Sequence, residues 1–534
     1  MTTAKSTWSA RGMVVAPHAL AAQSGVAVLR DGGNALEAMV AAAATISVVY
    51  PHMNGIGGDS FWLVHEPGED VVTIDACGRA AGGATVDFYR EHAQPAIPMR
   101  GPLAASTVAG TISGWALALN YSQRQWAGRL PLARLLDDAV HYAEHGIVVT
   151  GSQSAATRTK LAELERVPGF ADRFLVDGAV PQAGSLMKQT ALAATMRHLV
   201  KHGLGDFYDG ELARAIAADL ANVGSPLRLA DLEAHGAELR PPVRLDNSAG
   251  TLYNMAPPTQ GTVSLMILGI LDRLGIASAQ PDGADYVHLC IEAAKQAFLV
   301  RDRHITDPAF MKIDPQALLE PKALVKLASA VRREHALPWG AHSERGDTIW
   351  MGAIDAEGRA VSFIQSIYHE FGSGIVLARS GINWQNRGCS FSLDPRALNC
   401  LQPRRKPFHT LNPALAELRD GRVMVYGTMG GDGQPQTQSA IFTRYALFGQ
   451  EMQHAISAPR WLLGRTWGQA SDTLKLESRF APEVIAELTR RGHEVEVLQA
   501  YDETMGHAGG IARHASGALE AGFDPRSDGG AAGY

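Results

Sequence analysis

The chain has few cysteines, and its basic residues do not gather in runs. Its four cysteines (Cys77, Cys290, Cys389 and Cys400) form no Cys-x-x-Cys pair among 534 residues. A chain of this length can bury a large core and does not need disulfide bonds for stability. We therefore expect reduced thiols and a cytoplasmic protein. The net charge is −6, and no cluster of Lys and Arg could grip a phosphate backbone. A nucleic-acid partner is therefore not expected.

Long apolar runs and several well-known catalytic motifs are also missing. The longest mostly apolar stretch, 38–50, is shorter than the roughly 20 residues that span a bilayer, and the N-terminus carries no secretory signal pattern. We expect a buried helix there and no membrane partner. The chain has no G-x-S-x-G elbow, no P-loop and no H-E-x-x-H, and its histidines lack metal-ligand spacing. Neither a cofactor nor a metal is therefore expected.

The remaining pattern is that of a large α/β protein. Apolar residues make up 46% of the chain and charged residues 19%, which is usual for a soluble enzyme. Residues 17–50 predict two helices, the second with Asn34 as its N-cap. Residues 61–65 and 71–75 predict a strand hairpin, and residues 117–331 predict mostly helices.

The pattern changes close to Thr348. Residues 334–347 are polar, with Pro and Gly, and predict a processed or flexible linker. Residues 348–354 and 360–367 then predict the two strands of a hairpin that begins at Thr348. Another strand is expected at 423–427, followed by a glycine-rich loop and a helix.

Thr348 has a second interpretation besides that of a strand residue. If the Asp347–Thr348 bond is cut, Thr348 gains a free α-amine beside its own hydroxyl, which pairs a nucleophile and a base in one residue. An α-amine with a pKa near ~8 can accept the hydroxyl proton. Before cleavage, the hydroxyl could attack the Asp347 carbonyl, shift the chain to an ester and let water release it. On position alone, an ordinary strand threonine is the more common case.

Further motifs give the chain a resemblance along nearly its whole length. In order, they are Asp31-Gly-Gly-Asn-Ala35, Asn54-Gly-Ile-Gly-Gly-Asp59, Val108-Ala-Gly-Thr-Ile-Ser-Gly114, Asp347-Thr348, Phe371-Gly-Ser-Gly374, Gly427-Thr-Met-Gly-Gly431 and Asp524-Pro-Arg526. Each motif alone is weak, but in register they make the chain similar to the γ-glutamyltranspeptidase family of N-terminal-nucleophile hydrolases. The resemblance implies an α/β (α+β) fold, a four-layer αββα sandwich. It also implies a proenzyme that cleaves itself into fragments 1–347 and 348–534. These fragments would stay together as a heterodimer and could pair into a dimer of heterodimers.

The resemblance also implies the catalytic residues. Thr348 would be the nucleophile, and Ser366 the residue whose hydroxyl lies beside it. The backbone N–H groups of Gly430 and Gly431 would form the oxyanion hole, a role that suits glycine because the backbone must approach the substrate closely. Without the resemblance, the glycine pair would be a plain strand-to-helix turn.

The chain departs from the family where an α-amino acid head group would bind. Such a head group needs an arginine for its carboxylate and an acid for its ammonium. The arginine position falls on Cys77, and the acid position falls on Ser390. The candidate substrate-binding residues of this altered site are Arg79, Tyr368, Arg387, His409 and Thr410. The site has lost negative charge, so it should favour a small anion without an ammonium. Structural ion pairs or hydrogen bonds are the alternative roles for Arg387 and His409.

Within the family, the stretches 346–352, 366–374 and 384–388 resemble the oxamate amidohydrolase branch. Members of that branch act in purine degradation and release oxalate and ammonia. Oxamate is small and anionic and lacks an amine, as the altered site requires. Two alternatives stay open: a γ-glutamyltransferase or glutathione hydrolase with a remodelled pocket, and an unprocessed, non-catalytic family member that acts as a binding protein.

Overall fold

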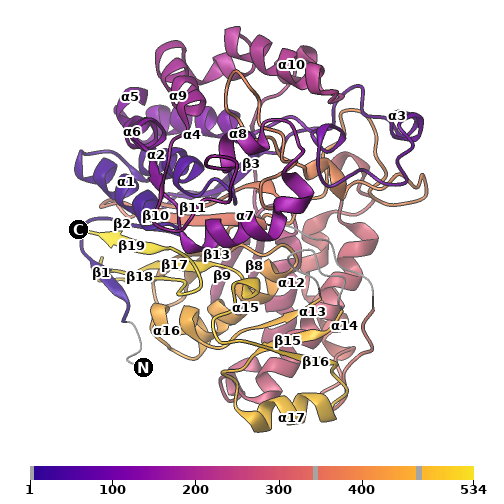
Figure 1. The fold of residues 1–534 in the computed structure, drawn as a ribbon. Coiled ribbons are helices and arrows are strands. Elements are labelled where there is room, and N and C mark those ends of the chain that lie inside the picture. Colours follow the sequence, from indigo (N-terminus) through magenta and orange to yellow (C-terminus); the bar gives the residue numbers. More distant parts are fainter. Residues whose placement is uncertain (1–4, 341–346, 465–471) are drawn as a thin grey trace.

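Two β-sheets stack face to face between two layers of helices (Figure 1). The computed structural model describes residues 5–340, 347–464 and 472–534. Residues 341–346 of the polar segment 334–347, which was expected to be a processed or flexible linker, lie outside the described residues. The four layers confirm the αββα sandwich.

The first sheet joins seven strands, all paired antiparallel, in the order β19-β2-β10-β11-β3-β4-β7. These strands are β19 (Gly530–Gly533), β2 (Met13–Ala16), β10 (Asp347–Ile354), β11 (Ala360–Tyr368), β3 (Asp59–His65), β4 (Val72–Ala76) and β7 (Glu238–Arg240). The expected hairpins β3–β4 and β10–β11 are confirmed.

The second sheet also has seven strands, in the order β1-β18-β17-β13-β12-β9-β8. They are β1 (Thr7–Ser9), β18 (Leu519–Phe523), β17 (Ala508–Arg513), β13 (Val423–Thr428), β12 (Ala414–Leu418), β9 (Gly250–Asn254) and β8 (Val243–Asp246). Strands β7, β8 and β9 lie in the stretch 117–331, for which mostly helices were expected. Each sheet interleaves strands from both sides of the Asp347–Thr348 bond, so a cut there would leave two fragments joined by strand pairing.

Helices cover the outer face of each sheet. The layer on the first sheet and its extensions contain α1 (Ala19–Arg30), α2 (Ala35–Val49), α3 (Val86–Glu91), α4 (Thr111–Gln125), α5 (Leu132–Leu135), α6 (Asp137–His145), α7 (Gly151–Leu164), α8 (Phe170–Phe174), α9 (Thr190–His202), α10 (Glu211–Val223) and α11 (Leu229–Glu233). The other layer contains α12 (Gly261–Arg273), α13 (Ala284–His304), α14 (Pro321–Ser329), α15 (Gly433–Phe442), α16 (Met452–Ser457) and α17 (Pro482–Arg490). Two small sheets are formed by β5 (Ile147–Val148) with β6 (Leu186–Met187), and by β14 (Trp461–Leu463), β15 (Leu474–Glu477) and β16 (Val495–Leu498).

Alternation along the strands builds a separate apolar core on each face of a sheet. On β11, Val361 and Phe363 belong to the core under the first helical layer. Ala360 and Ile364 belong to the core between the two sheets. Tyr426, on β13, belongs to a third core, under α12, α13 and α15.

Local signals explain the first helices. Asn34 caps α2 in a capping box with Glu37, as its position predicted, and every residue of α2 is buried.

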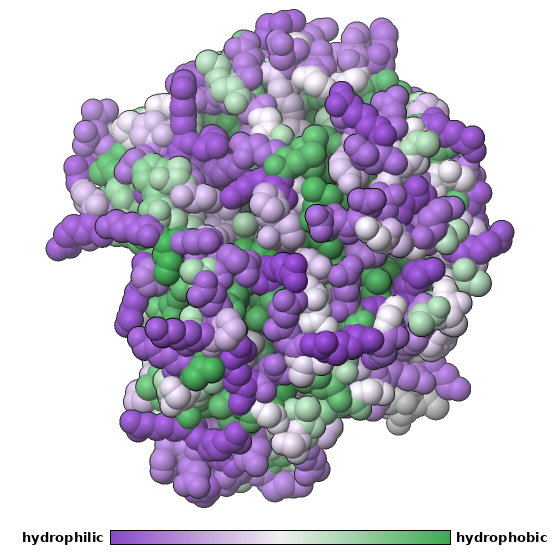
Figure 2. Space-filling view, turned by 180° about the vertical axis from the view of Figure 1, so that it is seen from behind, coloured by the Kyte–Doolittle hydropathy of each residue, from purple (hydrophilic) through white to green (hydrophobic). Residues whose placement is uncertain are grey.

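No helix in the described part of the chain is long and apolar enough to cross a membrane. The surface seen from behind carries polar and charged side chains over most of its area, with apolar side chains in smaller groups between them (Figure 2).

Candidate active site

Thr348 is fully buried near the start of β10, opposite an irregularity in β11. Asp347 pairs with Tyr368 and Ile349 pairs with Gln365, so two steps on β10 match three on β11. Such a bulge re-aims side chains next to functional sites. Tyr368 has a φ of 82°, and its N–H donates to Ser366 Oγ at 2.8 Å. The Ser366 hydroxyl is therefore held within the part of β11 that bulges opposite Thr348.

The ring of Trp350 fixes how closely the two sheets approach beside this site. A Cβ atom at Gly427 would lie 2.2 Å from the Trp350 ring, and one at Gly509 would lie 2.5 Å from it. Both contacts are shorter than any side chain tolerates, so only glycine fits at either position. Gly427 is the last but one residue of β13, directly before the loop that contains Gly430 and Gly431, so this close packing sets the position of that loop.

Gly430 and Gly431 lie in that loop, directly before α15. Their φ angles are 118° and 52°, a region that favours glycine. Their backbone N–H groups donate to no acceptor among the described residues, and the positive end of the α15 dipole adds to their field. Gln260 Nε2 donates to the carbonyls of Gly431 at 2.8 Å and Thr410 at 2.9 Å. Two fixed and unused donors are what an oxyanion hole requires.

Arg387 is a fully buried cation that forms no ion pair with any carboxylate of the described residues. Its guanidinium carbon lies 3.6 Å from the centre of the Tyr368 ring, and its exposed fraction is 0%. Nε, Nη1 and Nη2 have no hydrogen-bond partner within the described part of the chain. Burial lowers the pKa of Arg387, but a guanidinium stays charged near neutral pH. A buried charge normally has a partner, so the site is suited to receive an anion.

Three side chains immediately before Arg387 hold its segment to the protein. Trp384 Nε1 donates to the Thr107 carbonyl at 3.0 Å. Gln385 Nε2 donates to the Val108 carbonyl at 2.7 Å, and Asn386 Nδ2 donates to the Met99 carbonyl at 2.8 Å. Because each bond joins a side chain to a distant backbone, the position of Arg387 does not depend on a partner of its own.

Asp59 connects the motifs that surround Arg387. Its Oδ1 accepts from the N–H groups of Gly78 at 2.9 Å and Gly110 at 3.1 Å, and from Gln385 Nε2 at 3.2 Å. Its Oδ2 contacts His409 Nε2 at 2.9 Å. Burial raises the pKa of Asp59 to about 6, against the opposing effects of the Gly78 N–H and the Arg387 charge. Asp59 was not among the residues predicted for the site, although it ends the Asn54–Asp59 motif.

His409 is neutral in this arrangement. Burial, and then the charge of Arg387, hold its pKa well below the usual range. A neutral His409 that donates Nε2–H to Asp59 has an unprotonated Nδ1, and Nδ1 has no partner among the described residues. The adjacent Thr410 Oγ1 is also buried without a partner there. Both predicted residues therefore have polar atoms left for a ligand.

Cys77 lies beside this pair, with its Sγ, Asp59 and His409 ligand atoms within 4.8 Å of one another. Burial raises the pKa of the Cys77 thiol well above its usual range, so the thiol is protonated. Asp59 already accepts four hydrogen bonds. This set is therefore better suited to hydrogen bonding than to a metal ion, which needs a thiolate and free acceptor atoms.

Arg79 lies apart from the group around Arg387. Its side chain is 43% exposed and lies 3.7 Å from Glu238, and it donates to the Arg404 carbonyl at 3.3 Å. The structure therefore places Tyr368 and His409 near Arg387, whereas the Arg79 side chain contacts Glu238 and Arg404.

Known proteins are similar to this chain over nearly its full length. Residues 21–534 match the family described as gamma-glutamyltranspeptidase. The chain is 58% identical over 526 residues to the oxamate amidohydrolase proenzyme of Klebsiella pneumoniae, covering 98% of this chain and 99% of that protein. It is 41% identical over 530 residues to the glutathione hydrolase-like YwrD proenzyme of Bacillus subtilis, covering 99% of both. The crystal structure of cephalosporin acylase from Bacillus halodurans superposes with a TM-score of 0.90 at 31% identity, covering 100% of this chain and 98% of that one.

Proposed function

The chain belongs to the gamma-glutamyltranspeptidase family, and we propose that it is a self-processing amidohydrolase that converts oxamate, a small anionic amide, to oxalate and ammonia. The observation that carries the proposal is Arg387, a buried guanidinium with three unpartnered nitrogens. A planar guanidinium matches a carboxylate in two parallel hydrogen bonds. The 58% identity to an oxamate amidohydrolase proenzyme supports the same substrate.

Cleavage of the Asp347–Thr348 bond would generate the catalytic group. The Thr348 hydroxyl attacks the Asp347 carbonyl, the acyl group passes from nitrogen to oxygen, and water hydrolyses the ester. Fragments 1–347 and 348–534 stay together because β10 and β11 of the second fragment pair with β2 and β3 of the first. The freed α-amine of Thr348 then serves as the base for its own hydroxyl.

Hydrolysis would follow with the substrate carboxylate on Arg387. Thr348 Oγ attacks the amide carbon, and the N–H groups of Gly430 and Gly431 bind the oxygen that becomes negative. The α-amine takes the hydroxyl proton and passes it to the leaving nitrogen, which departs as ammonia. Water then attacks the oxalyl ester, and oxalate leaves with Thr348 restored. Neither step requires a metal or a cofactor. A place in purine degradation and in the cytoplasm belongs to the same proposal.

A γ-glutamyl substrate fits this group of residues less well. Its α-ammonium needs a carboxylate with free acceptor atoms. Asp59, the carboxylate that this group contains, already accepts from two backbone N–H groups, Gln385 and His409. Breaking those bonds to hold an ammonium would leave other buried polar groups unpaired, at about 1–3 kcal/mol for each.

The purified, processed protein should release ammonia from oxamate and turn over a γ-glutamyl anilide at least ~100-fold more slowly. That ratio corresponds to roughly 2.7 kcal/mol, about the loss from one unpaired charged contact. Ammonia and anilide release would be measured on one preparation, with unprocessed protein as the blank. Rapid anilide turnover without ammonia release from oxamate would favour the γ-glutamyl alternative and leave the fold unaffected.

Asp59→Asn should remove the pH dependence of KM for oxamate between pH 5 and 7. Because the pKa of Asp59 is about 6, lowering the pH in the wild type protonates this carboxyl and removes a negative charge near Arg387. Oxamate stays anionic and binds more tightly, so KM should fall roughly tenfold, as about 1.4 kcal/mol of charge interaction predicts. In the variant, KM should be low and flat.

Steady-state kinetics at several pH values separate this effect from loss of the Thr348 amine base, which changes kcat instead. Equal pH dependence of KM in both proteins would contradict a role for the Asp59 charge.

A further inference from the structure

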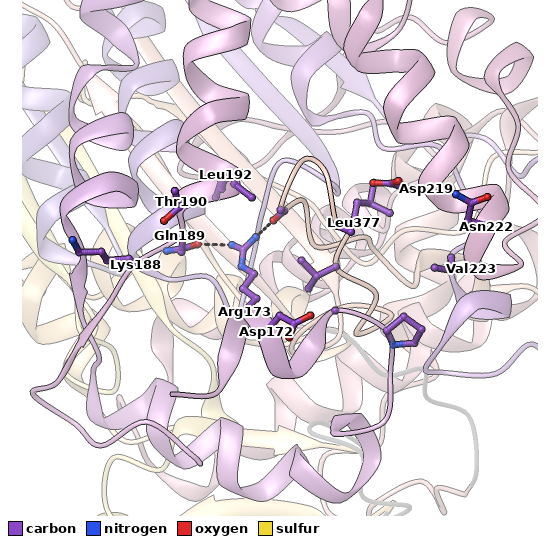
Figure 3. Close-up of a pocket in the computed structure, with 16 residues that line it drawn as sticks. Asp172, Arg173, Lys188, Gln189, Thr190, Leu192, Asp219, Asn222, Val223 and Leu377 are labelled. Carbon is purple, nitrogen blue, oxygen red and sulfur yellow. Dashed lines mark hydrogen bonds between the residues drawn. The ribbon is translucent and has the colours of Figure 1, made fainter. Parts of the chain in front are cut away.

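A second pocket, of about 500 Å³, lies between α8, α9, α10 and the loop 376–381. Pockets of this size hold small organic molecules. Its lining includes none of Thr348, Arg387 or His409, so it is not part of the site described above. Figure 3 shows its side chains, with Arg173, Lys188 and Thr190 on one side and Asp219 and Asn222 on the other.

Arg173 is a second buried arginine without an acidic partner. It is 9% exposed, and its guanidinium donates to the Gly381 carbonyl and, at 2.6 Å, to Gln189 Oε1 (Figure 3). Among the described residues its Nε has no partner, and no carboxylate forms an ion pair with it. Burial lowers the pKa of Arg173 to about 9. Its positive charge is therefore held in the wall of the pocket by neutral oxygen atoms alone.

The N-terminus of α9 forms the wall beside Arg173. Gln189, at the N-cap position, makes no capping hydrogen bond, because its side chain contacts Arg173 and the Val48 carbonyl. The N–H groups of Thr190, Ala191 and Leu192 find no acceptor in the part of the chain that the structure describes. No acidic residue occupies the first turn of α9. Free N–H groups at the positive end of a 13-residue helix attract an anion.

The rest of the pocket is mostly apolar. Val376 and Leu377 line the middle, and Val223 lines the far side. Asp219, at the far end, is engaged by Arg379, through its backbone N–H at 3.0 Å and its Nε at 3.4 Å. Asp172 also lines the pocket, but it is exposed to solvent. The positively charged end of the pocket and its apolar wall are thus adjacent.

We propose that this pocket binds a small organic carboxylate with an apolar body. The carboxylate accepts hydrogen bonds from the α9 N-terminus and compensates the charges of Arg173 and Lys188. The apolar body packs against Val376 and Leu377. Because these two residues precede the segment that carries Arg387, the pocket shares a chain segment with the candidate active site while its ligand stays separate from it.

The test is calorimetric titration of the full chain with benzoate, acetate and inorganic phosphate at low ionic strength. Benzoate should bind with a Kd below about 1 mM, and acetate at least tenfold more weakly, because it lacks the apolar body. Phosphate should also bind more weakly than benzoate, because it offers charge alone. Equal affinities for benzoate and acetate, or no saturable binding of benzoate, would overturn the proposal.

Two variants locate the binding. Thr190→Asp places a carboxylate at the start of α9, where it favours the helix, and should raise the Kd for benzoate at least tenfold. Thr159→Asp adds the same charge to an exposed position of α7 that does not line the pocket, and it should leave the Kd unchanged. Arg387→Met should also leave it unchanged. Loss of benzoate binding in Arg387→Met, or none in Thr190→Asp, would assign the binding to another site.

Discussion

Thr348→Ala should remain a single chain of 534 residues and release ammonia from oxamate at least ~10⁴-fold more slowly than the wild type. Removal of a nucleophile that also generates its own base takes away both chemical steps at once. Alanine lacks the hydroxyl that would attack the Asp347 carbonyl, and without cleavage no α-amine appears. Denaturing electrophoresis reports the first effect, and an ammonia assay the second.

Thr348→Ser is the matched control, because serine keeps the hydroxyl and loses one methyl group. It should still yield fragments of 347 and 187 residues, since 534 − 347 is 187, and keep part of the activity. Thr348→Ala should nonetheless fold, because β10 pairs with β2 and β11 whether or not the chain is cut. Cleavage at Asp347 in the alanine variant would refute the central assignment. A full-length wild type without activity would favour the non-catalytic alternative.

The parts of the fold that local sequence decides could be predicted. Asn34 and Glu37 lie three residues apart, and their capping box follows from that spacing. The β10–β11 hairpin likewise turns within a few residues. Strand β9 could not be predicted in this way, because Gly250 pairs with Leu418, more than one hundred residues later in the sequence. Its conformation is set by a tertiary partner rather than by its own pattern.

The same distinction divides the candidate site. Thr348, Gly430 and Gly431 lie in short motifs that a resemblance can locate. The Asp59–His409 contact joins residues 350 positions apart, and no spacing rule indicates it. Arg79 lies beyond the end of β4, where strand alternation no longer determines which way a side chain points. The exposure of the Arg79 side chain could therefore be learned only from the structure.

Arg387→Met should lower kcat/KM for oxamate by about 10³-fold, mainly through KM, and raise the thermal stability of the protein. Methionine keeps an apolar stem beside Tyr368 but offers no donors to a carboxylate. The carboxylate is present in both the ground state and the transition state, so its loss of binding appears in KM. The cleavage at Thr348 needs no anionic substrate, so both fragments should still form.

The gain in stability follows from the missing hydrogen-bond partners of Arg387. An unpaired buried cation opposes folding, and its removal should raise the free energy of unfolding by about 1–3 kcal/mol. Arg460 is the matched control: it is equally buried but lies 2.6 Å from Asp524. Arg460→Met should instead lower the stability, because Asp524 loses one of its two arginine partners and keeps only Arg526, at 3.0 Å. Thermal melts of the two variants would test the contrast.

A destabilised Arg387→Met with an unchanged KM would mean that Arg387 is a structural residue, and the oxamate proposal would then lose its main support. Opposite shifts in stability, together with a raised KM, would mean that the protein keeps an unpaired charge in its interior for the substrate.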